Sequence, residues 1–424
     1  MAIFKKKAVD LQREIFLGGL RGDRPVIPLR FSDLRLEVKD RLSGQAFDYL
    51  DGGAGAEATN ESNRAAFQRW QIVPQMLKGI SRTDLSIQLF GHDLECPLFL
   101  CPIGVLELAH PEGDLAVSSA CAQTNTPLMI SSQASNPMEA IAGIMPNALK
   151  FFQLYWSKSE ELVASFVSRA GDCGCRAIVV TLDTTLLGWR TRDLEHAYLP
   201  FLYAMGLSNY ISDPVFNRLM IEHPPQPGPQ PRPNLQLLRS LWKMASQYPG
   251  STWQNFKSRS PLRAIQKFIE IYMNPGLQWE DLRLLRELTD LPVVLKGIQH
   301  PDDARRAVDM GMDGIMVSNH GGRQIDGAIG SLDALRLCRE VVPDQMPLLF
   351  DSGIRSGADA FKALALGATA VGIGRPYAYA LGLAGSNGVT TLIDQYRAEL
   401  ELTMALSGCA SIDEINREML YTAN

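Results

Sequence analysis

Short apolar runs alternate along most of the chain with longer stretches in which apolar residues recur at helical spacing. Within a run nearly every position is apolar, as in the Ile-Val-Val of residues 178–180, which is typical of parallel strands covered on both faces. Eight runs are each followed by a helical pattern, and they cover residues 97–102, 127–131, 150–155, 177–183, 292–296, 314–319, 347–351 and 370–374. Eight such units in succession predict an α/β fold, a closed TIM (β/α)8 barrel.

The same pattern divides the chain into three parts. We expect a helical N-terminal extension at residues 1–95, the barrel at 96–385 and a C-terminal helical segment at 386–424. Within the extension, helical patterns near 31–50 and 59–70 flank a glycine-rich turn at 51–55.

A long insertion, at about residues 195–290, separates the fourth and fifth predicted strands. Its proline-rich centre, residues 224–233, is incompatible with a helix or a sheet and predicts an extended linker. The insertion also contains Trp242, Trp253, Phe256 and Tyr272. These aromatic residues are consistent with a lid or internal packing, with a subunit contact, or with a surface next to a membrane.

Composition narrows the function classes. The 41 basic and 46 acidic residues give a net charge of -5, which disfavours nucleic acid as a partner. No apolar run is long enough to span a bilayer and no secretory signal is visible, so we expect a cytoplasmic protein with no membrane contact. The seven cysteines are scattered without paired metal-ligand spacing, and we expect no metal site.

Polar residues end nearly every predicted strand. In a TIM barrel these positions meet at the carboxyl-end face, where active sites lie. The sequence therefore predicts one site, built from Pro102, Ile103, Gly104, Ser131, Gln153, Tyr155, Thr181, Asp183, Lys296, Ser318, His320, Asp351, Gly374 and Arg375.

The segment after the sixth strand carries the most distinctive chemistry. His320 and Arg323 lie three residues apart, with glycines between them, and thus combine a general base with a carboxylate-binding guanidinium. Asp183 can orient the imidazole, and Arg190 offers a second cation. Taken alone, the pair could equally be a loop histidine beside a surface arginine. Tyr49 and Tyr155 could donate phenolic hydrogen bonds or simply pack in the core.

Two glycine-rich turns follow the seventh and eighth strands, and they predict a phosphate site. Residues 351–357 contain Asp351, Ser352, Gly353, Ile354 and Arg355, and residues 372–376 contain Gly374 and Arg375. Backbone amides and arginines at these two strands form the common phosphate site of TIM barrels, although tight turns alone would give a similar pattern. Lys296 ends an apolar strand and needs negative charge nearby, such as that of a reduced flavin; a Schiff-base lysine is the rival interpretation.

At these residues the chain resembles the FMN-dependent 2-hydroxy-acid oxidase and dehydrogenase family, which includes glycolate oxidase and lactate oxidase. The likeness covers roughly residues 30–385 and is carried by four segments in the family's order: Phe152-Gln153-Leu154-Tyr155, Leu295-Lys296-Gly297, 318–324 and Gly374-Arg375-Pro376. The resemblance implies FMN as cofactor, with a small L-2-hydroxy acid and molecular oxygen as partners. It also implies a homo-oligomer, a tetramer or an octamer.

The resemblance also implies roles for individual residues. His320, Asp183, Tyr155 and Lys296 would be catalytic, and Tyr49, Tyr155, Arg190 and Arg323 would bind the substrate. FMN would contact Pro102, Ile103, Gly104, Ser131, Gln153, Thr181, Lys296, Ser318, Asp351, Ser352, Gly353, Ile354, Arg355, Gly374 and Arg375. Whether the substrate loses a hydride or passes through a carbanion stays open.

Two departures from the common family pattern indicate a branch. Gly104 stands where many members have alanine, and Gln133 where many have an aromatic residue. Together with Gly188-Trp189-Arg190 and the long insertion, they look most like the lactate 2-monooxygenase branch, which converts L-lactate to acetate, CO2 and water. An oxidase that releases keto acid and hydrogen peroxide, and a dehydrogenase linked to a quinone or cytochrome, remain alternatives.

Overall fold

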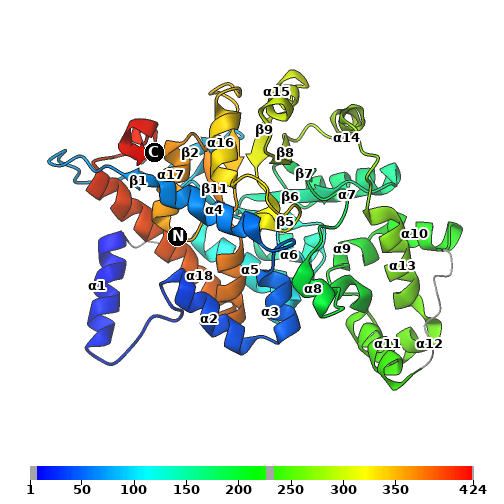
Figure 1. Ribbon diagram of the computed structural model, residues 1–424. Helices are drawn as coiled ribbons and strands as arrows, with labels where there is room; N and C mark the ends of the chain where they lie inside the picture. Colours follow the sequence, from blue (N-terminus) through cyan, green and yellow to red (C-terminus); the bar gives the residue numbers. More distant parts are fainter. Residues whose placement is uncertain (1–6, 226–233, 423–424) are drawn as a thin grey trace.

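The centre of the molecule is a closed barrel of eight parallel strands (Figure 1). The structure is a computed structural model, which describes residues 7–225 and 234–422. The strands, in the order in which they follow in the chain, are β4 (Leu98–Leu100), β5 (Leu128–Ser131), β6 (Lys150–Tyr155), β7 (Ile178–Thr181), β8 (Val293–Ile298), β9 (Gly314–Val317), β10 (Leu348–Phe350) and β11 (Ala370–Ile373). Strand β11 pairs with β4 and closes the barrel, so the predicted TIM fold is confirmed.

The strands are apolar along their length because both of their faces are buried. One set of alternate side chains, including Phe99, Met129 and Val179, fills the barrel interior. The other set, including Leu98, Ile178 and Val180, packs outward against the helices. This two-sided burial explains the continuous apolar runs in the sequence.

Helices cover the outside of the barrel. Each barrel strand except β7, after which the insertion begins, is followed by one of these helices: α5 (Gly113–Thr124), α6 (Met138–Ile144), α7 (Glu160–Asp172), α15 (Pro301–Asp309), α16 (Ser331–Arg339), α17 (Gly357–Ala365) and α18 (Arg375–Ser407). Side chains cap several of their amino ends, as at Ser159 of α7 and Ser356 of α17, whose side chains accept backbone N–H bonds.

The N-terminal extension is only partly helical, which corrects the prediction for residues 1–95. It contains α1 (Ala8–Gly19), α2 (Phe31–Arg41), α3 (Gly44–Asp51) and α4 (Ala58–Arg69), followed by β1 (Trp70–Ile72), β2 (Ile87–Leu89) and β3 (His92–Leu94). The helix predicted at 31–50 is interrupted at Leu42, which is extended, and Ser43 caps the second helix. The β2–β3 hairpin packs Leu89 and Leu94 against the interior side chains of the barrel.

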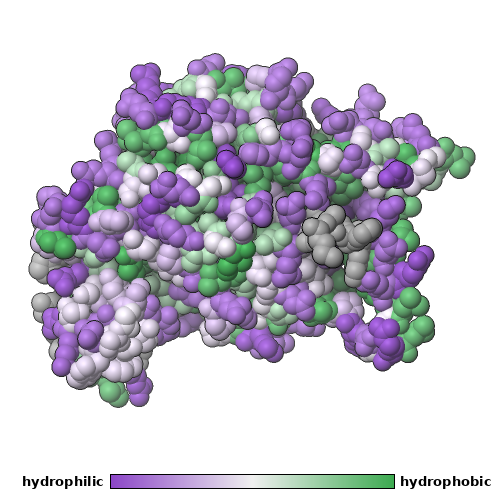
Figure 2. Space-filling model, turned by 180° about the vertical axis from the view of Figure 1, so that it is seen from behind, coloured by the Kyte–Doolittle hydropathy of each residue, from purple (hydrophilic) through white to green (hydrophobic). Residues whose placement is uncertain are grey.

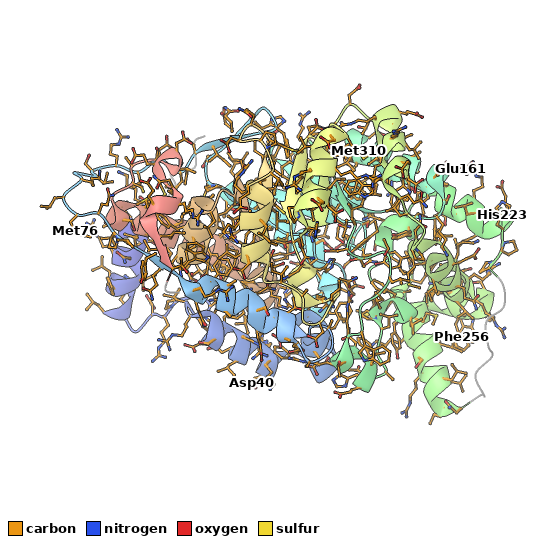
Figure 3. All side chains as sticks on the ribbon, turned by 45° about the horizontal axis from the view of Figure 1, so that its top comes forward. Asp40, Met76, Glu161, His223, Phe256 and Met310 are labelled. Carbon is orange, nitrogen blue, oxygen red and sulfur yellow. The ribbon has the colours of Figure 1, made fainter. Side chains whose placement is uncertain are left out.

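The insertion between β7 and β8 is helical in its described parts and forms the green lobe of Figure 1. It comprises α8 (Thr191–Glu195), α9 (Ser208–Ile211), α10 (Pro214–Glu222), α11 (Leu235–Gln247), α12 (Thr252–Ser258), α13 (Ser260–Tyr272) and α14 (Arg283–Leu288), with 3-10 turns at Pro200–Tyr203 and Trp279–Leu282. Most of the proline-rich segment predicted to be a linker lies outside the described residues. Figure 3 shows Phe256 in the outer part of this lobe.

The C-terminal segment also combines two kinds of structure. Helix α18 bends at Ala384 and Gly385, and the chain ends in the short strand β12 (Leu420–Thr422), which pairs with β1. The segment predicted as helical at 386–424 therefore also contributes a strand. None of the described helices has the length and apolar character needed to cross a membrane. The face of the molecule in Figure 2 is largely hydrophilic, with scattered hydrophobic residues.

Candidate active site

A cavity lies at the carboxyl ends of the barrel strands. Its wall combines residues from the strand ends, from α3 and from the insertion. Predicted site residues in the wall are Tyr49, Pro102, Ile103, Gly104, Tyr155, Arg190, Lys296, His320, Arg323, Asp351, Ser352, Gly353, Ile354, Arg355, Gly374 and Arg375. The structure therefore brings most of the candidates from six strands into one place.

His320 and Asp183 form the central pair of the cavity. The Nδ1 atom of His320 lies 2.8 Å from Asp183 Oδ1, and Thr184 Oγ1 donates to the same carboxylate oxygen at 2.9 Å. His320 has a φ of 57°, a left-handed conformation that is rare outside glycine, and its backbone N–H donates to Ser318 Oγ at 3.0 Å. Because Asp183 occupies Nδ1, the Nε2 atom is the nitrogen left to act on a bound molecule.

The protonation states of this pair suit a general base. Burial lowers the pKa of His320 below its usual value, and Lys296 and Arg190 add to this effect against the opposing influence of Asp183. Burial alone would raise the pKa of Asp183, but its interactions with His320, Lys296 and Thr184 bring it to about 2. His320 is therefore neutral, and Asp183 is ionised, at neutral pH.

The lowered pKa of His320 predicts the pH dependence of the reaction. Because the neutral imidazole is the active form, the acid limb of a plot of kcat/KM against pH should lie below the ordinary histidine pKa of about 6.5. Steady-state assays from pH 5 to pH 8 on the FMN-loaded protein check this. An acid limb well above about 6.5 would contradict the assignment of His320 as the base.

Lys296 is held as a buried cation. Its Nζ donates to Ser318 Oγ at 2.9 Å and lies 3.6 Å from Asp351 Oδ2. Burial would lower the pKa of Lys296, but Asp351 and Asp183 raise it above its usual value. A Schiff-base lysine needs a neutral amine, so this environment favours the charge-stabilising interpretation of Lys296 over the rival one.

Two arginines and a tyrosine surround the space next to His320. Arg190 is 7% exposed and donates to Gln324 Oε1 at 3.2 Å, while its Nε atom has no partner in the described chain. Arg323 donates to the backbone oxygens of Tyr49 and Gly52 and lies over the Tyr49 ring. Burial and the neighbouring Arg190 lower the pKa of Arg323 to about 9. Neither arginine forms a salt bridge with a carboxylate of the described residues, so both are available to bind an anionic substrate.

The phosphate end of the cavity contains a second pair of cations. Arg375 donates to the backbone oxygens of Leu50, Gly321 and Gly52, and Arg355 donates to that of Ile354. Burial and Arg375 lower the pKa of Arg355 to about 10, and its buried Nε has no partner among the described residues. These unmatched charges, next to the glycines of the seventh and eighth strand ends, fit the phosphate of FMN.

Some predicted residues lie beneath the cavity instead of in its wall. Gln153 donates to Thr181 Oγ1 at 2.9 Å and accepts from Ser131 Oγ at 3.4 Å, so these three strand-end residues form one buried chain of hydrogen bonds. Ser318 likewise holds Lys296 and the backbone of His320. Asp183 contacts the cavity through His320.

The sequence did not reveal several residues that build the site. Gln324 connects Asp183 with Arg190. Its amide nitrogen donates to the backbone oxygen of Asp183, and its amide oxygen accepts from the Arg190 guanidinium. Asn63 of α4 and Asn319 exchange two side-chain hydrogen bonds, which fix the loop that carries His320. The insertion adds Phe201 and Tyr272 to the cavity wall, and Leu187 and Cys101 also line it.

Asp51 is the anchor of the α3 helix that carries Tyr49. It accepts hydrogen bonds from Arg35, Arg192 and Tyr379, at 2.5–2.8 Å. Burial would raise the pKa of Asp51, but these donors lower it well below its usual range. The carboxylate thus ties α3 to α2, α8 and α18 at neutral pH.

Comparison with known proteins agrees with this geometry. A family model described as FMN-dependent dehydrogenase matches residues 38–422. An L-lactate oxidase of Lysinibacillus sphaericus (strain C3-41) is 39% identical over 400 residues, covering 94% of this chain and 94% of that protein. The 2-hydroxyacid oxidase 1 of Homo sapiens is 36% identical over 389 residues, covering 92% of this chain and 95% of that protein. The crystal structure of a mandelate oxidase with (S)-4-hydroxymandelic acid matches with a TM-score of 0.76 at 35% identity, covering 93% of this chain and 99% of that one.

The barrel and its site thus define a flavoenzyme, and the chain belongs to the FMN-dependent dehydrogenase family. Within that family it is an enzyme of the FMN-dependent 2-hydroxy-acid oxidase group, with FMN as its cofactor.

Proposed function

We propose that this enzyme oxidises a small L-2-hydroxy acid, with L-lactate as the first substrate to test, and uses molecular oxygen as the acceptor in the manner of a lactate 2-monooxygenase. The observation that carries the proposal is one cavity that holds the His320–Asp183 pair beside Arg190 and Arg323. This set matches a molecule with a carboxylate on one carbon and an oxidisable C–H on the next.

The two arginines bind and orient the substrate. Arg190 and Arg323 would hold its carboxylate, and the hydroxyl groups of Tyr49 and Tyr155 lie in the same wall to bond the 2-hydroxyl. Burial raises the pKa of both tyrosines, so they keep their protons and act as donors. The substrate's charge in turn relieves the repulsion between the two guanidinium groups.

The proton leaves the substrate at His320. Its neutral Nε2 accepts the proton, and the ionised Asp183 stabilises the imidazolium that results. When bound, FMN supplies the two-electron acceptor for this oxidation. Lys296, held as a cation by Asp351, places positive charge where negative charge develops.

The fate of the keto acid separates two versions of the proposal. In the monooxygenase version, the keto acid stays on Arg190 and Arg323 while oxygen is reduced to peroxide. The peroxide then decarboxylates pyruvate, and acetate, CO2 and water leave. Gly104 and the Gly188-Trp189-Arg190 segment support this version. The simple oxidase version is supported by the relatives, which are called oxidases.

Product analysis distinguishes the two versions. We expect the FMN-loaded protein, supplied with L-lactate in air, to form acetate and CO2 in equal amounts with little free hydrogen peroxide. Chromatography of the acids and a peroxidase-coupled peroxide assay on the same sample measure both. Pyruvate and peroxide in equal amounts would contradict the monooxygenase version and leave the oxidase in its place.

We also propose that the enzyme works in the cytoplasm as a homo-oligomer, a tetramer or an octamer. None of the seven cysteines forms a disulfide within the described residues, which suits a reducing compartment. Helix α1 and the residue after it expose Phe16, Leu17 and Leu20 as an apolar surface that a second copy could cover. Light scattering of the purified holoenzyme should give a mass of four or eight chains; a monomer would contradict the oligomer.

A further inference from the structure

One side chain in the cavity wall carries a polar group that the protein leaves unsatisfied. Gln133 follows β5, lines the cavity and is 5% exposed. Its amide nitrogen, Nε2, is buried; the Tyr272 hydroxyl lies near it, but no hydrogen bond of ordinary length and angle to a described residue satisfies it. An unsatisfied buried amide is unfavourable, so a ligand that accepts this bond is favoured over one that does not.

The backbone around Gln133 is fixed on two sides. Its N–H donates to Ser131 Oγ at 3.1 Å, and its carbonyl oxygen accepts from the N–H of Val105 at 3.0 Å. A Cβ atom on Gly104 would lie 3.0 Å from Gln133 Cβ, and one on Gly206 would lie 3.0 Å from the Gln133 carbonyl oxygen. Part of the room left by Gly104 is therefore filled by Gln133 itself, and the base of this side chain has little freedom to move away.

The Gln133 amide has an uncharged polar neighbour. The Tyr272 hydroxyl interacts with the Gln133 side chain, and burial raises the pKa of Tyr272, so that this hydroxyl stays protonated. Phe201 lies beside Tyr272 at a ring-centroid distance of 6.4 Å, and Leu187 lines the same cavity. Aromatic and aliphatic walls with one amide and one hydroxyl suit a short carbon chain that carries an uncharged oxygen.

The position of this wall points to one carbon of the substrate. Under the proposed function, Arg190, Arg323, His320 and Tyr155 engage the first two carbons. The Tyr272 ring lies edge-on to that of Tyr155, 5.4 Å between centroids. The Gln133–Tyr272 wall therefore remains to contact the third carbon.

We propose that Gln133, together with Tyr272, recognises an uncharged hydroxyl or carbonyl oxygen on the third carbon of the substrate. The enzyme would then prefer 3-oxygenated L-2-hydroxy acids over their alkyl counterparts. This inference rests on the proposed function and narrows its substrate class, with L-lactate as the reference molecule that lacks the oxygen.

The test compares L-glycerate with L-lactate, which differ by one hydroxyl on the third carbon. We expect kcat/KM of the FMN-loaded protein to be at least about tenfold higher for L-glycerate, since one recovered hydrogen bond of about 1.4 kcal/mol corresponds to tenfold. Gln133→Leu keeps the approximate volume and removes the amide, so the preference should fall at least about tenfold. Gln71→Leu, a matched change at an exposed residue of β1, should leave it unchanged.

A binding measurement accompanies the kinetics and does not depend on turnover. The affinities of hydroxypyruvate and pyruvate are measured from the change that each causes in the flavin absorption spectrum. We expect hydroxypyruvate to bind more tightly than pyruvate to the parent protein, and this difference in affinity to disappear in Gln133→Leu. Tyr272→Phe, which keeps the ring, should lower the same preference and serves as the second variant if Gln133→Leu does not fold.

Each outcome is decisive. If both acids reduce the FMN but their kcat/KM ratio is the same in Gln133→Leu and the parent protein, or if the parent prefers L-lactate, the inference is wrong and the proposed function stands. If neither acid reduces the FMN, the proposed function fails together with the inference.

Discussion

Replacing His320 with glutamine should slow reduction of the bound FMN by L-lactate by a factor of about 10²–10⁴, the usual contribution of a general base. Glutamine retains the size and polarity of the side chain but cannot accept the substrate's proton. The binding of FMN should survive, because the phosphate end is built from Arg355, Arg375 and the glycine-rich turns. Anaerobic stopped-flow measurements, which follow flavin absorbance, give the rate directly.

His223→Gln is the matched control for this experiment. His223 is exposed at the end of α10, and Figure 3 shows it at the outer edge of the molecule. We expect this variant to reduce FMN at the parent rate. Undiminished reduction in His320→Gln would remove His320 from the mechanism, whereas loss of bound FMN would show that its main role is structural.

Arg323→Met should chiefly weaken substrate binding. Removing one partner of an enclosed charge pair costs about 2–5 kcal/mol, so KM should rise about 30-fold or more, with a smaller change in kcat. Arg323 also donates to the backbone of Tyr49 and Gly52, so part of the loss reflects a looser α3. Steady-state kinetics with L-lactate measure the changes in KM and in kcat separately.

Arg13→Met provides the control for the loss of a guanidinium, because Arg13 is exposed on α1. Pyruvate binding, followed through the flavin spectrum, should weaken in Arg323→Met in parallel with KM and stay unchanged in Arg13→Met. An unchanged KM in Arg323→Met would show that its charge does not bind the carboxylate.

The barrel could be predicted from the sequence because each strand is buried on both faces. Runs such as residues 178–180 and 292–295 have no polar alternation, and the helical pattern after each run repeats. The hairpin of β2 and β3 gave no such signal. Each of its strands has only three residues. Leu89 and Leu94 pack against the barrel interior, but the local sequence pattern does not distinguish them from apolar residues in a loop.

The site was predictable where it depends on strand ends and less so where it depends on tertiary packing. The strand-end rule located His320, Asp183 and Lys296 because a barrel brings those ends to one face. Tyr272 was ambiguous, since four aromatic residues of the insertion had similar sequence surroundings. Its burial and its contact with Tyr155 place it at the cavity, whereas Trp242 and Trp253 stay about half exposed.

The hydrogen-bonding state of a side chain is likewise invisible in the sequence. Gln133 could be recognised as a polar residue in the substrate wall, but whether its Nε2 is satisfied by the described residues depends on the tertiary packing around it. Arg323 could be assigned to a carboxylate, but its bonds to the end of α3 follow from the packing of the extension on the barrel.

The central claim is that this chain passes electrons from an L-2-hydroxy acid to its FMN. The most direct test mixes the purified, FMN-loaded protein anaerobically with L-lactate, L-glycerate or D-lactate and follows the long-wavelength flavin absorption. We predict full bleaching by an L-acid and none by D-lactate. A flavin that stays oxidised with both L-acids, in protein shown to contain FMN, would contradict the account.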